Sequence, residues 1–434
     1  MREMKDSGIE WIGKIPNTWK LSKIGQVYTE RKTRVSDRDY PPLSVTMKGI
    51  LPQLDTAAKT DAHDDRKLLC KGDFAINSRS DRRGSCGISP VDGSISLINI
   101  VLQPKEKMDS QYYEWMFHSS MFSDEFYKWG HGIVDDLWTT GWQDMKRIAI
   151  PVPDLLEQKR IAMFLNEQCG ELDNVLVKTR ASIEEYKKLK QAVITQAVTK
   201  GIRGSRKTKD SGIEWLGSIP ANWNLIKITR LLDYGHSYPI GDGDHGLIKT
   251  DDYIDLGVPY IRVQNLGWGT ELNYDNLVYI SEERNQMIAN SILKPNDILF
   301  AKTGATIGKT AIIPDSIPVS NTTSHIGKIT VSSNYNPRFV FYVMSSYVVY
   351  RQFWEMAGLK TTRPELSIDE IKKIRIAIPS TLEEQDSIVK YLDRICKNLD
   401  KLINKKESYI AEIENYKKSF IYEYVTGKKE VPDT

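Results

Sequence analysis

Two stretches of the chain carry a spacing of apolar residues that predicts long helices. In residues 154–201 and 381–428, apolar positions recur at alternating intervals of four and three, which places them along one side of a helix. Neither stretch contains a proline, so nothing in them forces a break. About 43 residues at ~1.5 Å each would give a rod of about 60–65 Å.

Both predicted helices begin with the same kind of start signal. Asp154 and Thr381 are residue types that cap helix N-termini. Glu157 and Glu384 follow three residues later, which predicts a capping box in each copy.

The two apolar stripes match each other at a constant offset of 227 residues, polar interruptions included. The first runs Leu165, Cys169, Leu172, Leu176, Thr179, Ile183, Tyr186, Lys190, Val193, Ala197, and the second Leu392, Cys396, Leu399, Ile403, Lys406, Ile410, Ile413, Lys417, Phe420, Tyr424. A single amphipathic rod needs a partner for its stripe, so we expect the two helices to pair. The alternative is two separate helices on the surface of a globular core.

A shorter duplication precedes each helical stretch. Residues 6–24 and 210–228 are identical at thirteen of nineteen positions and lie 204 residues apart. Both copies carry two tryptophans, namely Trp11, Trp19, Trp215 and Trp223. Because they recur while the sequence after each copy diverges, we expect these tryptophans to pack where each body meets the helices.

The bodies between motif and helix predict mixed α/β domains with one plan and different loops. In the second body, short β-rich runs separated by turn residues predict strands, and a longer run predicts one helix. These are Val258–Val263, Asp297–Lys302, Lys309–Ile313 and Ile326–Val331 for the strands and Pro337–Phe353 for the helix. The first body matches it more faintly: residues 68–80 align with 292–304, and the IAIP of 148–151 with that of 376–379.

Composition excludes several classes of protein. The polar start is unlike a secretory signal, and no apolar run is long enough to span a bilayer, so we expect a cytoplasmic protein without membrane contact. The four cysteines form no CxxC pair, which argues against a zinc site. A net charge of +3 permits nucleic-acid binding only through local patches.

Two apparent catalytic motifs fail on spacing. The turn from Gly304 to Lys309 has three residues between its glycines where a phosphate-binding loop has four, so a glycine turn that exposes Lys302, Thr303 and Lys309 is favoured. The letters of a PD…ExK nuclease around Asp154 fall within one helical turn and fit a cap better. We find no catalytic constellation and no metal-ligand spacing among the six histidines.

Several loops place cations beside hydrogen-bonding side chains, as DNA-reading loops do. Arg pairs with guanine and Asn or Gln with adenine in the major groove, while Lys, Ser and Thr often hold phosphates. The candidate DNA-binding residues are Arg79, Arg82, Arg83, Arg262, Gln264, Asn265, Lys302, Thr303, Lys309, Lys360, Thr361, Thr362 and Arg363. The basic stretch 200–209 predicts a flexible linker that could also contact phosphates.

These motifs together resemble the DNA specificity subunits of type I restriction–modification enzymes. The resemblance rests on the doubled SGIEWxGxIPxxW motif, the Pro…Glu-Gln entry to each long helix, and the alternation of variable body and helix. It covers nearly the whole chain. A "GDI…G…G" core is clear in the second body at Asp297, Gly304 and Gly308, and weaker in the first at Asp73.

The resemblance implies an organisation and a set of partners. Residues 1–153 and 204–380 would be target recognition domains, each reading one half of a two-part DNA target, and 154–203 and 381–434 would be spacer helices in an antiparallel coiled coil with internal pseudo-twofold symmetry. Two modification (methyltransferase) subunits would bind S-adenosylmethionine and methylate adenine, and motor-nuclease restriction subunits can join. This chain would hold no cofactor. Helix pairing and partner docking would fall to Glu157, Gln158, Leu165, Leu172, Leu176, Ile183, Glu384, Gln385, Leu392, Leu399, Ile403 and Ile410.

Two other hypotheses remain open from the sequence. The chain could be an orphan specificity or scaffold protein that binds partners without tight DNA binding. It could also be an enzyme that uses the glycine turn or the acidic helix start.

Overall fold

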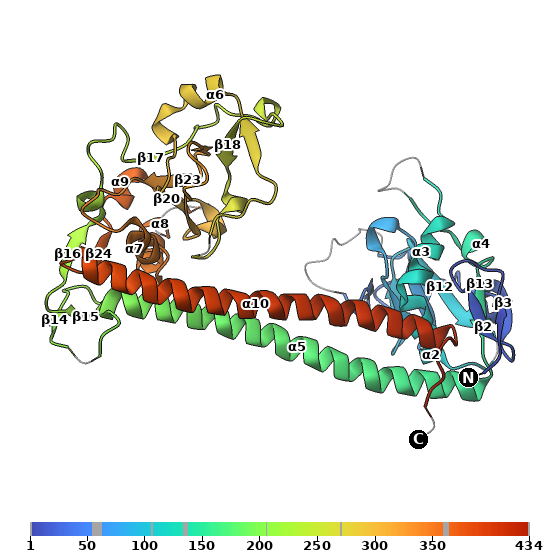
Figure 1. Cartoon of the computed structure of the whole chain (residues 1–434). Coiled ribbons are helices and arrows are strands. Elements are labelled where there is room, and N and C mark those ends of the chain that lie inside the picture. Colours follow the sequence, from blue (N-terminus) through green and yellow to red (C-terminus); the bar gives the residue numbers. More distant parts are fainter. Residues whose placement is uncertain are drawn as a thin grey trace. The chain divides into compact units, whose positions relative to one another are not determined.

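A computed structural model describes residues 2–53, 63–105, 107–132, 138–204, 206–269, 271–358 and 364–432. The chain divides into two compact units (Figure 1). Unit 1 comprises Met1–Arg180 and Glu407–Thr434, and unit 2 comprises Ala181–Lys406. Each unit therefore combines one α/β body with one end of each long helix.

The elements of the first body precede the first long helix. They are β1 Met4–Asp6, β2 Lys14–Pro16, β3 Lys20–Lys23, α1 Ile24–Val27, β4 Tyr28–Glu30, β5 Arg34–Val35, β6 Leu43–Thr46, β7 Gly49–Pro52, β8 Arg66–Leu69, β9 Phe74–Asn77, η1 Ser80–Arg82, β10 Cys86–Ile88, β11 Gly93–Ile95, β12 Asn99–Pro104, α2 Ser110–His118, α3 Ser120–Lys128, α4 Trp142–Met145 and β13 Ala149–Val152. The long helix α5 is Leu155–Lys200.

The second body repeats this order with longer connections. Its elements are β14 Thr208–Asp210, β15 Ser218–Pro220, β16 Asn224–Lys227, η3 Ile228–Leu231, β17 Ile240–Asp242, η4 Thr250–Asp252, β18 Val258–Ile261, η5 Val263–Asn265, β19 Val278–Ile280, α6 Glu282–Met287, η6 Ala289–Ser291, β20 Ile298–Ala301, η7 Gly304–Thr306, β21 Thr310–Ile312, β22 Asn321–Thr322, β23 Ile326–Ile329, α7 Pro337–Met344, α8 Tyr347–Ala357, α9 Ile368–Ile371 and β24 Arg375–Ile378. The second long helix, α10, is Leu382–Val425.

Each body is built on a four-stranded sheet and a three-stranded sheet, so the mixed α/β class is confirmed. The four-stranded sheets run β10-β9-β12-β4 in unit 1 and β17-β23-β20-β21 in unit 2. Strand β9 lies between β10 and β12, and β20 occupies the same place between β21 and β23. The strands predicted in the second body correspond to β18, β20, β21 and β23.

An aspartate stands before the central strand of each four-stranded sheet and binds a cation. In unit 2, Asp297 and Lys328 are both buried, with 3.8 Å between the ammonium and the carboxylate. Burial raises the pKa of the Asp297 carboxyl and lowers that of the Lys328 ammonium, and the partner charge opposes both shifts. In unit 1, Asp73 binds Arg31 at 2.6 Å. The paired cation lies on a different part of each sheet: Lys328 is on β23, whereas Arg31 directly follows β4. The two aspartates are therefore equivalent in sequence, although the residues that pair with them are not.

The single helix predicted for Pro337–Phe353 is wrong, because the chain forms two helices there. Helix α7 ends before Ser345, and Ser346 is the N-cap residue of α8. The hydroxyl groups of both serines donate back to the carbonyls of Phe341 and Val343, which competes with helix continuation. Unit 1 repeats the break between α2 and α3, where Ser119 caps α3.

The alignment of the two IAIP segments is wrong by two residues. Lys23 pairs with Ala149 and Lys227 pairs with Arg375, and the two lysines are equivalent at the offset of 204. Ala149 therefore corresponds to Arg375, an offset of 226 and not 228. A shift of two residues keeps every side chain on the same face of a strand, so the pattern alone could not detect the error.

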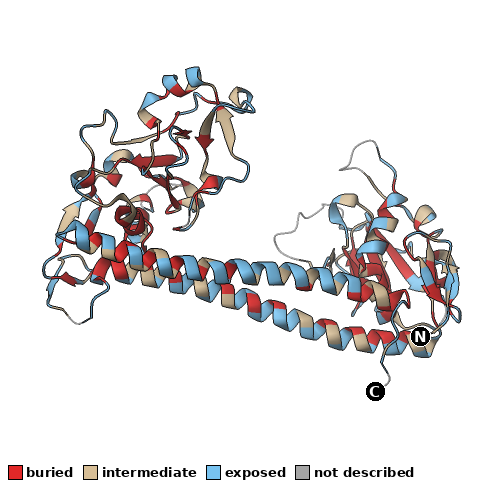
Figure 2. Cartoon of the chain, viewed as in Figure 1, coloured by how far each residue is buried: buried red, intermediate tan, exposed pale blue. Residues whose placement is uncertain are grey.

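The two long helices pair in antiparallel fashion within each unit. In unit 1, Phe164 on α5 packs against Phe420 and Tyr424 on α10. In unit 2, Tyr186 on α5 lies under the ammonium of Lys406. Most of the predicted stripe is buried on both helices (Figure 2). The expected pairing of the two stripes is therefore confirmed.

Two of the polar interruptions, Lys190 and Lys417, form ion pairs between the helices. In unit 2, Lys190 contacts both carboxylate oxygens of Asp400 at 2.8 Å. In unit 1, Lys417 contacts Asp173 at 2.6 Å. Because 190 and 417, like 173 and 400, differ by 227, one pair repeats the other. Each pair links a fixed residue of one helix to a fixed residue of the other, which specifies the register.

Replacing Asp400 by Asn should destabilise unit 2. The Lys190 side chain, which is 6% exposed, would lose its counter-charge. Since Asp400 is itself 40% exposed, we expect a loss of about 1–2 kcal/mol in the free energy of unfolding, measured by urea denaturation. Glu412→Gln, an exposed change on the same helix, should stay within about 0.5 kcal/mol of the parent. Overlapping curves for Asp400→Asn and the parent would contradict this role.

Candidate nucleic-acid interface

The doubled motif joins each body to both long helices. In unit 1, the indole N–H of Trp19 donates to Glu157 in the first turn of α5 at 2.6 Å. The guanidinium of Arg2 lies over the Trp19 ring at 5.2 Å and forms an ion pair with the same carboxylate. Arg2 also donates to the carbonyl of Gly427, just beyond the end of α10, at 3.0 Å. One carboxylate thus connects the motif, the start of one helix and, through Arg2, the end of the other.

Unit 2 contains the same joint with equivalent residues. Arg206 forms an ion pair with Glu384 at 2.7 Å and lies over the ring of Trp223 at 5.9 Å. Burial alone would raise the pKa of the Glu384 carboxyl, but Arg206 and neighbouring N–H groups outweigh it, and the pKa is lowered. The indole N–H of Trp223 contributes to that electrostatic effect without forming a hydrogen bond of normal geometry. Arg2 and Arg206 differ by 204, the offset of the motif.

A lysine and a glycine at each helix end complete the joint. Lys428 donates to the carbonyl of Ile12, and Lys200 donates to the equivalent carbonyl of Leu216. Both α10 and α5 are followed by a glycine with positive φ, Gly427 at +71° and Gly201 at +76°. A Cβ atom at Gly201 would lie 2.5 Å from the Arg206 guanidinium, so a larger residue would require the end of the arginine side chain to shift.

The glutamates do not close capping boxes, contrary to the prediction. Asp154 does cap α5, accepting a hydrogen bond from the backbone N–H of Glu157 at 2.9 Å. The Glu157 side chain turns away from the cap toward Trp19 and Arg2. The Glu157 carboxylate therefore accepts hydrogen bonds from a charged guanidinium and an indole N–H, in place of the backbone N–H of the cap residue that a capping box would have supplied.

Gln158 and Gln385 fasten a second element of each body to the long helices. The side-chain oxygen of Gln158 accepts from the backbone of Asp109, the N-cap of α2, and that of Gln385 accepts from Asn336, the N-cap of α7. Both glutamines are buried. Their contacts lie inside the chain, as do those of the two glutamates; the sequence had assigned all four to helix pairing and partner docking.

The expectation that the tryptophans pack at the joints is confirmed for three of them. Trp11, Trp19 and Trp223 are at most 2% exposed, and Trp215 is partly buried against the core of unit 2. The Trp19 ring meets Tyr112 of α2 edge to face at 6.4 Å. Rings covered to this degree have no free face on which a base could stack.

The arginine cluster of unit 1 lies on a turn after β9. Arg82 and Arg83 are exposed, whereas Arg79 is partly buried. Arg83 contacts Asp124 at 3.2 Å and lies over the Tyr127 ring at 5.2 Å. Because this ion pair is open to solvent, it contributes little to stability and leaves Arg83 able to exchange partners.

Acidic residues surround the same cluster. A cavity of about 830 Å³ opens beside Arg83 and Lys128. Its lining includes Glu10, Asp81, Asp124 and Glu125. Carboxylates accept hydrogen bonds from cytosine amino groups but repel phosphates, so this surface suits contact with base edges better than with the backbone.

Of the adjacent residues Gln264 and Asn265 in unit 2, only Gln264 is exposed. The Asn265 side chain is 0% exposed, accepts from the backbone of Arg262 at 2.9 Å and donates to the carbonyls of Asn273 and Asp275. Its polar atoms are thus occupied in holding the turn η5. The expectation that Asn265 faces DNA conflicts with this burial.

Arg262 is held partly against its own unit. Its guanidinium donates to the carbonyl of Asn276 at 2.6 Å and lies over the Tyr253 ring at 5.6 Å. Gln264 makes only a long contact of 3.5 Å to the same carbonyl. Gln264 is therefore the freer of the two to contact a ligand.

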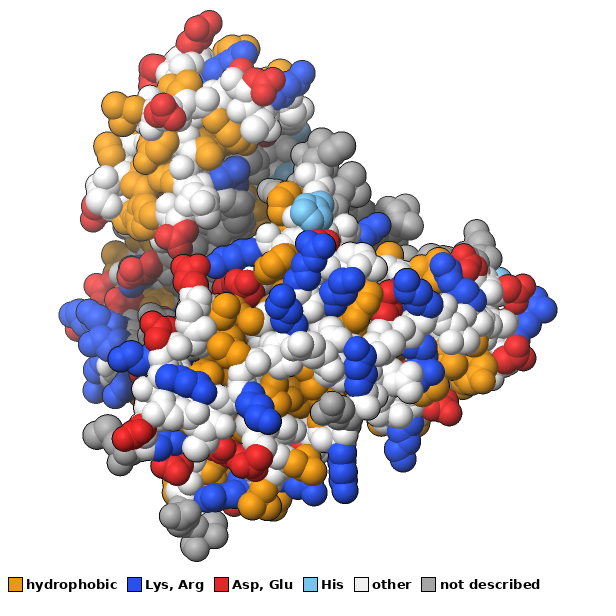
Figure 3. Space-filling view, turned by 90° about the vertical axis from the view of Figure 1, so that its right-hand side faces the viewer, with side chains coloured by type: hydrophobic (Ala, Val, Ile, Leu, Met, Phe, Trp, Pro, Cys, Tyr) orange, Lys and Arg blue, Asp and Glu red, His pale blue; other side chains and the backbone are white. Residues whose placement is uncertain are grey.

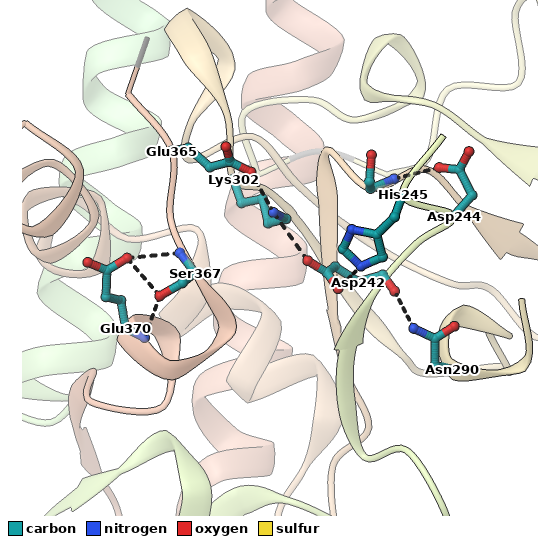
Figure 4. A network of polar contacts seen from close by, with 9 residues as sticks. Asp242, Asp244, His245, Asn290, Lys302, Glu365, Ser367 and Glu370 are labelled. Carbon is teal, nitrogen blue, oxygen red and sulfur yellow. Dashed lines mark hydrogen bonds and ion pairs between the residues drawn. The ribbon is translucent and has the colours of Figure 1, made fainter. Parts of the chain in front are cut away.

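Lys302 and Thr303 are buried, so the prediction that the glycine turn exposes them is wrong. The Lys302 ammonium contacts Asp242 at 3.2 Å and Glu365 at 3.0 Å (Figure 4). His245 contacts the other oxygen of Asp242 at 3.1 Å. A buried ammonium needs such counter-charges, and the distant acidic residues that supply them could not be paired with Lys302 from sequence.

The rest of the glycine turn gives a mixed result. Lys309 is partly exposed and has no ion pair within the described part of the chain. The backbone of Gly304 and Leu366 pairs with Pro364 and Lys302, which anchors the segment that follows residue 363. The candidates Lys360, Thr361, Thr362 and Arg363 lie outside the described residues. The turn forms a short 3-10 helix between strands, so it lacks the long helix that a phosphate-binding loop requires.

The sequence did not single out a set of cations that occupies equivalent places in the two units. Lys23 and Lys227 are exposed on β3 and β16, and Arg147 and Lys373 are exposed just before the strands that pair with them. None of the four has an ion pair among the described residues. Lys and Arg side chains are scattered over the face shown in Figure 3, with acidic residues between them. Only the strand register reveals the match, because the sequence alignment here was two residues out.

Comparison with known proteins finds similarity to one family. Residues 246–414 match the family described as the type I restriction modification DNA specificity domain. The chain is 27% identical over 345 residues to the MjaVIII specificity subunit of Methanocaldococcus jannaschii, an alignment that covers 77% of this chain and 74% of that protein. It is also 27% identical over 293 residues to the EcoBI specificity subunit of Escherichia coli, covering 64% and 58%. The chain is thus similar in sequence to type I specificity subunits over most of its length.

The fold of the chain agrees with that of a solved structure. A chain from a structure that describes complex assembly and conformational transition of a type I R-M system has a TM-score of 0.70 and 15% identity. The match covers 96% of this chain and 99% of that chain. None of the helices in the described ranges has the length and apolar character that crossing a membrane requires.

Asn265 and Gln264 should separate folding from binding. Asn265→Ala removes three hydrogen bonds from a fully buried site and should lower the free energy of unfolding by about 2–3 kcal/mol. Gln264→Ala, at the exposed neighbouring position, should change it by less than about 0.5 kcal/mol. Chemical denaturation of both variants would measure the difference. Equal destabilisation would show that Asn265 does not hold the turn.

The joint of unit 2 should weaken in acid. A carboxyl whose pKa is lowered by folding contributes stability above its ordinary value, 4.5 for Glu384, and that contribution is lost as the pH falls through the folded value. We expect Glu384→Gln to remove part of the acid-induced drop in melting temperature. Glu383→Gln, at an exposed position in the same turn, should retain it. Identical acid profiles for the two variants would contradict the assignment.

Proposed function

We propose that this chain is the non-catalytic DNA-reading subunit of a type I restriction–modification complex. Each body would be a target recognition domain that reads one half of an asymmetric, two-part sequence. The observation that carries the proposal is the contrast between joints and loops: both bodies are held by equivalent Arg–Trp–Glu contacts, while their cation-bearing turns differ. Common scaffolds with unlike loops are expected when loops carry recognition.

The accessible members of the predicted set support one reading surface on each body. In unit 1 these are Arg82 and Arg83, beside acceptor carboxylates. In unit 2 they are Gln264, Lys309 and the partly buried Arg262. Guanidinium and amide groups read guanine and adenine edges, which suits recognition of two different half-sites. Lys302, Thr303 and Asn265 would support these surfaces from within.

The cations at equivalent positions in the two units suit contacts with DNA that do not depend on the base sequence. Lys23 with Arg147, and Lys227 with Lys373, stand at matching positions and carry no counter-ion among the described residues. We propose that they hold phosphates on either half-site, because lysines and arginines at phosphates position DNA without reading it.

Two matched apolar positions on the long helices support docking of two copies of one partner. Val175 and Tyr416 lie within two residues of the ion pair in unit 1, and Leu402 and Leu189 lie at the equivalent places in unit 2. All four are between 38% and 54% exposed. We propose that modification subunits dock here. They would bind S-adenosylmethionine and methylate adenine, and restriction subunits can join them. The buried Gln158 and Gln385 and the partly buried Glu157 and Glu384 would then act inside the chain.

The chain expressed with its modification subunit should direct adenine methylation to a two-part motif. Arg83→Ala should relax or weaken recognition at one half-site, and Gln264→Ala at the other, each by about 1–3 kcal/mol of discrimination. Sequencing of methylated bases across a genome would show both effects. A continuous motif, or one variant that alters both halves, would contradict the two-reader proposal. Partner binding with no methylation and no shift of DNA in a gel would favour the scaffold alternative.

A further inference from the structure

We propose that Glu157 and Glu384 are positioning residues that set the angle at which each body leaves its helix pair, and thereby the gap between the two half-sites. The inference rests on the proposed two-part recognition. It concerns residues that touch neither the exposed arginines nor the glycine turn, so it assigns spacing and base recognition to different groups of atoms.

The geometry at Glu157 supports a positioning role. The motif, the N-terminal segment and the start of α5 meet at its carboxylate through Trp19 and Arg2, and Arg2 continues the contact to Gly427. A carboxylate accepts from a guanidinium and an indole in fixed directions, so it constrains rotation as well as distance. Gln158 ties the start of α5 to α2, and Trp115 and Tyr112 of α2 also donate hydrogen bonds to α5 and α10.

The charged groups of the joint lie at the edge of the apolar core, whereas Trp19 belongs to that core. The sheets and helices of unit 1 are held by a large apolar cluster that includes Phe74, Phe117 and Leu165, each at most 1% exposed. The Glu157 side chain remains 25% exposed at the margin of that cluster. Loss of its charge should therefore loosen the orientation of the body before it disrupts the core.

The two joints differ in one respect, which predicts that a substitution in one joint has a larger effect than the equivalent substitution in the other. In unit 2, the end of α5 and the second motif are joined covalently by residues 201–207. In unit 1, the end of α10 and the first motif belong to opposite ends of the chain, and side chains such as Arg2, Tyr422 and Lys428 make the connection. With no covalent link, the first joint depends more on its charges. Glu157→Gln should therefore have a larger effect than Glu384→Gln.

The test uses the full chain co-expressed with its modification subunit. Methylation would be followed on DNA in which the gap between unchanged half-sites is varied base pair by base pair. We expect Glu157→Gln to lower the preference for the parental gap over its neighbours by about tenfold, the effect of losing a charge-assisted hydrogen bond. Glu384→Gln should lower it less, and both should leave the half-site bases unchanged.

Controls separate this role from a merely structural one. Glu167→Gln and Glu383→Gln, exposed changes on the same two helices, should keep the parental gap preference. If Glu157→Gln fails to fold, Arg2→Gln removes the guanidinium that pairs with Glu157 from a partly exposed position and should show the same loss. Equal loss of methylation at every gap, or an unchanged preference in all variants, would overturn the proposal. A parental chain with no two-part motif would instead overturn the proposed function.

Discussion

A helix of 46 residues with one apolar stripe has to bury that stripe, and this requirement organises the molecule. The stripe of α5 is covered partly by the first body and partly by α10. Because α10 runs antiparallel to α5, its own stripe is covered in the same way, partly by the second body and partly by α5. The ion pairs Lys190–Asp400 and Lys417–Asp173 then select one register among those that would bury the same surface. Burial supplies the driving force and the ion pairs supply the specificity, as polar groups in coiled coils commonly do.

The joints extend the same logic from the helices to the bodies. Each joint uses a residue from the start of one long helix and a residue from the end of the other, so a body can be held correctly only where the two helices are paired. This explains why the motif is repeated closely while the loops are not. The motif has the same task in both units, whereas each set of loops faces a different ligand in the proposed function.

Much of the architecture was predictable because it depends on periodicity. The heptad spacing identified the helices and their pairing, and β-rich runs identified β18, β20, β21 and β23. Where a pattern has two equivalent solutions, prediction failed. The IAIP register was wrong by one period of the strand, and the serine break between α7 and α8 was hidden inside an apolar run that a single helix would also satisfy.

The candidate site was less predictable, because a side chain's role depends on its neighbours in space. Lys302 and Asn265 have the composition of DNA-reading residues, yet each is buried among partners such as Asp242 and Asn273 that are distant or unremarkable in sequence. Arg2 could have been found, since it shares the offset of 204 with Arg206. Its partner could not, because a glutamate three residues after a cap has a ready local explanation.

The sequence by itself determined the duplicated plan, the two long helices, the mixed α/β bodies and the resemblance to type I specificity subunits, since repeats and periodicity are properties of order along the chain. Only the tertiary structure decided which charges are exposed, which strand register holds, and that Glu157 binds tryptophan and arginine while Glu384 binds arginine. Those outcomes depend on desolvation, because a charge leaves water only where other segments bring it compensating partners. The doubled motif can thus be recognised from the order of residues along the chain, whereas the role of its side chains can be recognised only from their contacts in the folded structure.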